Sequence, residues 1–216
     1  MVRTFLRHAI TALSALSAAT ALVVGLAEPA SAAVPPGIPT KATAQSQLNS
    51  LTVRAEGASS AYDRALFPHW VAVEGTCDAR EYVLKYDGSN VTVDSTCKAT
   101  AGSWYSEYDG VTTTDASSFD IDHMVPLAEA WNSGADTWTT AKRRDFANDV
   151  SSPQLWAVSA SSNRSKGDKD PAKWMPPRTA IHCSYVKSWI NVKYRYGLAV
   201  DSAEKTALQN NLNSRC

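Results

Sequence analysis

Two polar runs, each of which follows a strand-like segment, constrain the fold of this 216-residue chain more than any other feature. The first run covers residues 120–127 (DIDHMVPL), and we expect a strand over 118–123 to lead into it. The second run covers 163–171 (NRSKGDKDP), and it follows a short apolar strand expected over 155–159. Because each run lies at the end of a strand, the two runs meet if these strands fold against each other.

The first run places a carboxylate directly before an imidazole, at Asp122 and His123. A neutral histidine is a competent general base at pH 7, and a carboxylate can hold a hard cation such as Mg²⁺. Adjacent residues of a strand point to opposite faces, so both side chains reach one site only if the strand ends or bends there. Pro126, three residues further along, is consistent with such an end.

The second run offers an amide and two cations. Asn163 can supply a carbonyl oxygen as a second metal ligand, while Arg164 and Lys166 can bind phosphate. We expect Asn163 to open a helix, whose N-terminus would favour an anion. Together the runs contain the base, the metal ligands and the cations that phosphodiester hydrolysis requires.

In this order, Asp-x-Asp-His-x-x-Pro-Leu, an apolar strand and Asn-Arg-x-Lys form a pattern that resembles the HNH (ββα-metal, His-Me finger) endonucleases. In particular, the chain resembles secreted bacterial proteins of this kind that are related to the C-terminal domain of GmrSD restriction enzymes. The resemblance extends from 62–70 (YDRALFPHW) to 173–176 (KWMP), and its HNH core covers about 119–171. It implies an α+β fold in which a ββα-metal core is embedded in additional β-hairpins and C-terminal helices.

The resemblance also implies a role for each residue of the two runs. His123 matches the general base, Asp122 and Asn163 match the metal ligands, and Lys166 matches a cation that contacts phosphate. The implied metal is Mg²⁺, with Mn²⁺ as the alternative. The zinc-knuckle cysteines of many HNH proteins are absent from this core, so its stability would come from the added elements.

One position departs from the family pattern. Such motifs often carry an asparagine nine residues before the last one, where it holds the loop of the base through backbone hydrogen bonds. Gln154 stands at this position, so either Gln154 or Asn148 is expected to take the role. Asp120 is either a third polar ligand or a strand-end residue, and Glu129 could lie behind the metal ligands.

The N-terminus predicts export. Residues 1–32 combine a basic start, an apolar stretch over 9–27 and the small-residue pattern Ala-Ser-Ala at 30–32, which is typical of a secretory signal peptide cleaved after Ala32. A membrane anchor is the alternative, because the apolar stretch approaches spanning length. The cleavage pattern favours a secreted protein without a membrane segment, and 33–39 reads as a flexible leader.

All four cysteines follow this segment, at Cys77, Cys97, Cys183 and Cys216. An even number in an exported chain indicates two disulfides. Their spacing has no C-x-x-C pattern, so a zinc site is not expected. Of the three possible pairings we favour Cys77–Cys97 with Cys183–Cys216, because each pair flanks a compact two-element unit.

The remaining patterns predict a single nuclease-type domain over 40–216 that mixes helices with hairpins. Asp-Gly pairs between β-branched and aromatic segments predict the hairpins, while apolar spacing and caps predict the helices. The hairpins are expected over 81–94 and 102–114, and the helices over 41–53, 126–134, 137–148, 182–196 and from 201 onward.

Charge is unevenly divided along the chain. Residues 41–120 hold 6 basic and 11 acidic residues, whereas residues 160–216 hold 10 basic and 4 acidic residues. The basic part could form a phosphate-binding face or simply solvated helix surfaces. The formal net charge of zero argues against very tight non-specific binding to nucleic acid.

These patterns together predict a secreted, metal-dependent endonuclease that acts as a monomer without an obligate protein partner, with DNA favoured over RNA. Two alternatives remain open at this point. One is a non-catalytic exported binding module on an HNH scaffold, and the other is a toxin-like nuclease with an immunity partner.

Overall fold

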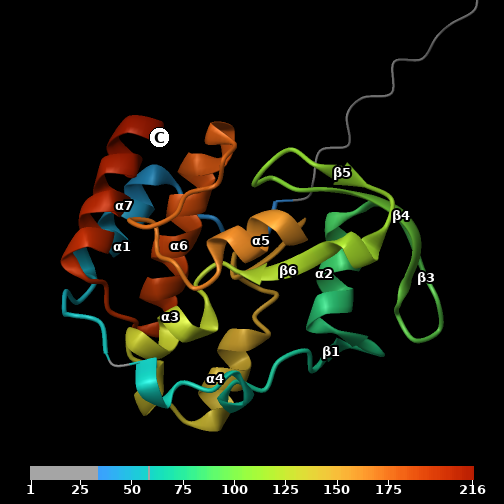
Figure 1. Ribbon diagram of the computed structural model, residues 1–216, viewed down its shortest axis with the longest axis horizontal. Helices are drawn as coiled ribbons and strands as arrows, with labels where there is room; N and C mark the ends of the chain where they lie inside the picture. Colours follow the sequence, from blue (N-terminus) through green and yellow to red (C-terminus); the bar gives the residue numbers. More distant parts are fainter. Residues whose placement is uncertain (1–33, 58) are drawn as a thin grey trace, which may run out of the picture.

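The computed structural model describes residues 34–57 and 59–216 (Figure 1). The signal peptide expected over 1–32 lies outside the described residues. Within them no helix combines the length and apolar character needed to cross a membrane. Helices α1, α6 and α7 gather at one side of the molecule, strands β3, β4 and β5 lie at the other, and β6 with α5 lies between them (Figure 1). The expectation of a mixed α+β fold is confirmed.

The helical side consists of α1 (Lys41–Ser50), α6 (His182–Tyr196) and α7 (Ser202–Arg215). Local signals set their ends, as predicted. Gly197 ends α6 in the left-handed region at φ 69°, and Asp201 caps α7 in a capping box with Glu204. The predicted Cys183–Cys216 disulfide joins α6 to the end of α7, while α1 ends three residues earlier than expected.

The opposite side corrects one prediction. Residues 81–94 were expected to form a hairpin, yet α2 (Ala79–Asp87) occupies most of the first half. Asp78 and Glu81 make a capping box at its start, and Val83 and Leu84 are buried on one face. The predicted Cys77–Cys97 disulfide is present, but it closes a helix and a strand rather than a hairpin.

The strands of this side form two small antiparallel sheets. The predicted hairpin over 102–114 is confirmed by the pairing of β4 with β5, and β3 pairs with the other edge of β4. Their bounds are β1 Ala72–Glu74, β2 Cys77–Asp78, β3 Ser89–Val93, β4 Ala99–Tyr105 and β5 Thr112–Thr113.

The two predicted strands at the centre are confirmed as β6 (Phe119–His123) and β7 (Leu155–Ser159). They pair antiparallel with His123 opposite Leu155 and Phe119 opposite Ser159. Helix α5 (Ala160–Lys166) follows β7 directly and is capped by the Ser159 side chain. Asn163 therefore lies in the middle of α5 and does not open it, so the expected helix N-terminus is not at this residue.

The connection between β6 and β7 carries α3 (Leu127–Asn132) and α4 (Thr140–Ala147). Both helices were predicted, although α4 starts later than expected, after a cap at Thr139. Single turns of 3-10 helix complete the fold at Ser59–Ala61, Arg64–Leu66, Ala116–Ser118, Ala135–Thr137 and Thr179–Ile181.

Strand alternation gives β6 one apolar face and one acidic face. Phe119 and Ile121 pack into the smaller cluster, together with Val83, Leu84 and Trp104. Asp120 and Asp122 point to the opposite face, since successive side chains of a strand alternate. That face meets α5, so strand periodicity directs both carboxylates toward Asn163 and Lys166.

Candidate active site

The two polar runs share one hollow of about 380 Å³. The end of β6 contributes Asp122 and His123, and α5 contributes Asn163 and Arg164. A third wall comes from the segment before β1, which contributes Tyr62 and Arg64. The required strand end is present, because β6 stops at His123.

His123 is held in one neutral form. Its Nε2 lies 2.9 Å from the Ala147 carbonyl oxygen, and because a carbonyl only accepts, Nε2 carries the proton and Nδ1 carries the lone pair. Burial, together with the nearby charges of Arg64 and Lys166, lowers the pKa of His123 to about 3. The imidazole is therefore unprotonated at neutral pH.

Trp70 covers this imidazole, with its ring 5.5 Å from that of His123 and tilted by 31°. Its backbone lies in the left-handed region at φ 57°, which is costly for a bulky residue. Asn148 holds the segment on both sides, since its Oδ1 accepts from the Val71 N–H and its Nδ2 donates to the Pro68 carbonyl. Asn148 therefore holds residues 68–71, the segment that lies over His123. It is not the residue that holds the loop after His123.

Gln154 holds that loop. Its fully buried side chain accepts a hydrogen bond from the Val125 N–H and donates one to the Val125 carbonyl, both at 3.1 Å. The Gln154 carbonyl also accepts from the Met124 N–H. Of the two amides considered for the missing asparagine, Gln154 is the one that bonds to the backbone directly after His123.

Replacing Gln154 by alanine is expected to lower the free energy of unfolding by about 1–3 kcal/mol, because the buried N–H and carbonyl groups of Val125 lose their hydrogen-bond partners. Urea unfolding checks this change. Gln209→Ala is the control, since Gln209 bonds to Gln45 on the partly exposed surface. Equal stability of the two variants would contradict the structural role of Gln154.

Asp122 forms a buried ion pair with Lys166. The Lys166 Nζ lies 2.8 Å from both carboxylate oxygens and from the His123 carbonyl oxygen, and the Tyr108 hydroxyl donates to Asp122 at 2.7 Å. Burial raises the pKa of Asp122 and lowers that of Lys166, and their mutual attraction opposes both shifts.

This position differs from the role predicted for Lys166. The side chain is fully buried and its three N–H donors are all used within the protein. A phosphate contact would therefore require an existing bond to break. The exposed cations of the hollow are instead the predicted Arg164 and Arg64, which was not singled out from the sequence.

Asn163 contacts Asp120, to whose Oδ2 it donates from Nδ2 at 3.0 Å. In this orientation the amide oxygen of Asn163 can act as a ligand for a cation. Asp122 has about four lone-pair positions, of which Lys166 and Tyr108 occupy three. Hard oxygen donors of this kind fit a divalent metal such as Mg²⁺, with Asp120 next to them.

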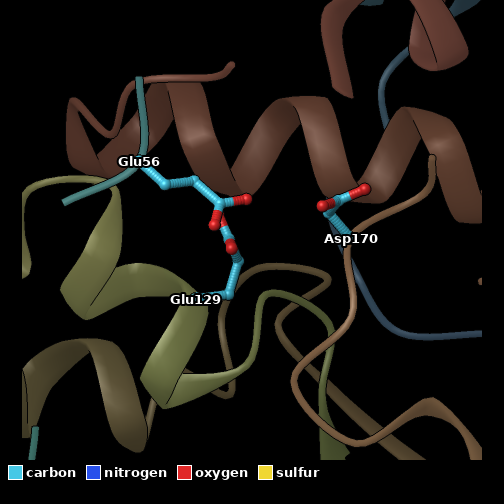
Figure 2. A group of neighbouring side chains, drawn as sticks. All are labelled: Glu56, Glu129 and Asp170. Carbon is cyan, nitrogen blue, oxygen red and sulfur yellow. The ribbon is translucent and has the colours of Figure 1, made fainter. Parts of the chain in front are cut away.

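A separate group of acids lies at Glu56, Glu129 and Asp170 (Figure 2). Their carboxylate oxygens lie within 4.8 Å of one another. Two lysines balance them, because Lys193 lies 2.6 Å from Glu129, and Lys173 lies 2.8 Å from Glu56 and 2.6 Å from Asp170. Glu129 therefore belongs to an ion-pair network and does not line the hollow, so the position behind the metal ligands that we considered for it from the sequence is not supported.

Comparison with known proteins identifies the family of the chain. The family model of the GmrSD restriction endonucleases, C-terminal domain, matches residues 82–211, and the chain belongs to this family. An uncharacterized secreted protein of Arthroderma benhamiae is 53% identical over 204 residues, which cover 94% of this chain and 98% of that protein. No solved structure matches.

The prediction of a secreted protein is confirmed by this relative, and the protein is secreted. This relative comes from a fungus, so it does not test the resemblance to bacterial proteins. The family match begins at residue 82, so the wall of the hollow that contains Tyr62 and Arg64 precedes the matched region, as does Trp70 beside His123.

Proposed function

We propose that the protein is a secreted endonuclease that hydrolyses the phosphodiester bonds of nucleic acid. The observation that carries this proposal is the shared hollow, where a neutral imidazole, oxygen donors and exposed arginines meet. The order β6, β7 and α5 supports assignment of residues 119–166 to a ββα-metal core. DNA is the favoured substrate, because the family is named for restriction endonucleases.

In this mechanism His123 acts as the general base. Its Nδ1 takes a proton from a water molecule, whose oxygen attacks phosphorus in line with the leaving 3′-oxygen. The bond from phosphorus to the 3′-oxygen breaks and the leaving oxygen takes a proton from solvent water, so the products carry a 5′-phosphate and a 3′-hydroxyl. The bond from Nε2 to Ala147 keeps the imidazole in the tautomer that this step needs.

Asp122 and Asn163 would hold one divalent metal, for which Mg²⁺ is favoured and Mn²⁺ is the alternative. When bound, the metal would supply positive charge that stabilises the transition state and the leaving oxygen. Lys166 holds the Asp122 carboxylate and the His123 carbonyl in register, which places ligand and base relative to each other.

Removal of the metal is expected to abolish cleavage. Supercoiled plasmid is incubated with the protein and Mg²⁺, with Mn²⁺, and with EDTA, and excess Mg²⁺ is then added to the EDTA sample. Cleavage should appear with either metal, disappear with EDTA and return with excess Mg²⁺. A ligase that requires 5′-phosphate ends should rejoin the products.

Cleavage that survives EDTA would contradict the role of the metal. Absence of cleavage with several divalent metals would favour the alternative of a non-catalytic exported binding module. Products that ligase joins only after treatment with a kinase would contradict the position of bond breakage.

A further inference from the structure

We propose that Arg64 is a phosphate-binding residue of the hollow and that, with Arg164, it holds the backbone of the nucleic-acid substrate. The identity of this ligand rests on the proposed function. The two arginines reach the hollow from different walls, Arg64 from the 3-10 turn Arg64–Leu66 and Arg164 from α5.

A short chain of hydrogen bonds orients the guanidinium of Arg64. The Nδ1 of His69 lies 2.7 Å from the Phe67 carbonyl oxygen, to which it must donate, so the lone pair of His69 is on Nε2. This nitrogen accepts from the Nε of Arg64 at 3.4 Å. The two terminal nitrogens of Arg64 are the fork that binds phosphate in a bidentate manner, and this bond leaves them available.

No carboxylate of the described chain neutralises the charge of Arg64, so this charge can interact with a ligand. Neither Arg64 nor Arg164 forms an ion pair with a carboxylate of the described chain. The neighbouring Asp63 carboxylate accepts instead from the Ala65 N–H and caps the turn. Asp168 also lines the hollow, and its charge offsets part of the positive field there.

Arg64 and the proposed base line the same hollow. The charge of Arg64 acts on His123, and the Tyr62 hydroxyl lies beside the same guanidinium. Lys166, the cation that the sequence favoured for phosphate, is buried against Asp122. A phosphate that approaches His123 therefore meets the two arginines as its exposed cationic partners in the hollow.

Binding of a short fluorescent DNA duplex tests this proposal. Arg64→Gln, Arg64→Lys and the control Lys41→Gln are each made in a His123→Ala background, and the dissociation constant is measured by anisotropy in Mg²⁺ over a series of salt concentrations. Lys41 is exposed on α1, which does not line the hollow, so the control removes the same charge elsewhere. Thermal unfolding shows whether each variant is folded.

Arg64→Gln is expected to weaken binding about tenfold or more and to reduce the slope of log Kd against log salt by about one. Arg64→Lys should keep the slope and lose part of the affinity, because it retains charge without the fork. Lys41→Gln should change neither quantity appreciably.

Equal behaviour of Arg64→Gln and Lys41→Gln would overturn the proposal, and so would weaker binding with an unchanged slope, which indicates a structural role. Cleavage is scored separately, with His123 intact. Binding that depends on Arg64 without any cleavage would reject the nuclease and keep the phosphate site. Cleavage together with binding that does not depend on Arg64 would keep the nuclease and reject the phosphate site.

Discussion

Replacing His123 by alanine is expected to reduce cleavage of DNA by about 10²–10⁴-fold, the range typical for loss of a general base. The variant removes the Nδ1 lone pair while the oxygen donors of Asp122 and Asn163 remain. Initial rates of plasmid nicking, measured with Mg²⁺ at several protein concentrations, give the size of the loss.

Two further variants separate loss of the base from loss of packing. His123→Gln can still donate to the Ala147 carbonyl but offers no basic nitrogen, so it should be as inactive as the alanine variant. His182→Gln is the matched control, because His182 is also buried and its Nε2 lies 2.7 Å from a backbone carbonyl, that of Pro176. It should retain activity.

Full activity of His123→Gln would remove the histidine from the proposed mechanism. Equal losses in His123→Gln and His182→Gln would show that disturbed packing explains the effect. Because burial keeps the pKa of His123 low, the wild-type imidazole is unprotonated at neutral pH and its Nδ1 lone pair is present before the substrate binds.

Replacing Lys166 by methionine is expected to lower the free energy of unfolding by about 3–5 kcal/mol, because the buried Asp122 carboxylate loses its counter-charge. For a domain of this size the loss corresponds to roughly 10 °C in Tm. Thermal unfolding with the disulfides intact measures it. The His123 carbonyl loses a donor in the same variant, so cleavage should fall as well.

A double-mutant cycle isolates the ion pair. Asp122→Leu combined with Lys166→Met should be more stable than the sum of the single changes predicts, because no charge is then left without a partner. Lys85→Met is the surface control, since Lys85 pairs with Glu74 where both side chains are exposed to solvent, and its Tm should hardly change. A Lys166→Met protein as stable as Lys85→Met would contradict a tight buried pair.

Elements with local signals could be predicted from the sequence. Helix α6 has both predicted ends, because apolar spacing and Gly197 are visible in a short window. Helix α2 was missed because the Asp87-Gly88 pair and the β-branched residues nearby indicate a hairpin. The capping box of Asp78 with Glu81, which favours the helix, was overlooked.

The contents of the hollow were only partly predictable. Asp122, His123, Asn163 and Arg164 could be chosen because their chemistry is written in two short runs, and they do line one hollow. Burial of Lys166 depends on a contact between residues 44 positions apart, which no local pattern reveals.

Arg64 and Trp70 were missed for a related reason. Both lie in the stretch 62–70, which carries part of the family resemblance but none of the expected base or metal ligands. They matter because the fold brings this stretch next to His123, and the residue types alone do not reveal that contact.

The walls of the hollow come from two regions of the sequence, and these regions have different roles in the proposed function. The wall built by β6 and α5 lies within the family-matched residues 82–211 and carries the groups to which we assign hydrolysis in the proposed function. The wall that carries Tyr62 and Arg64 precedes the match. In the proposed function, a relative that keeps the wall of β6 and α5 but differs in the wall of Tyr62 and Arg64 would cleave the same bond and bind its substrate through other side chains. Substrate preference in such proteins could therefore diverge while the reacting groups stay unchanged.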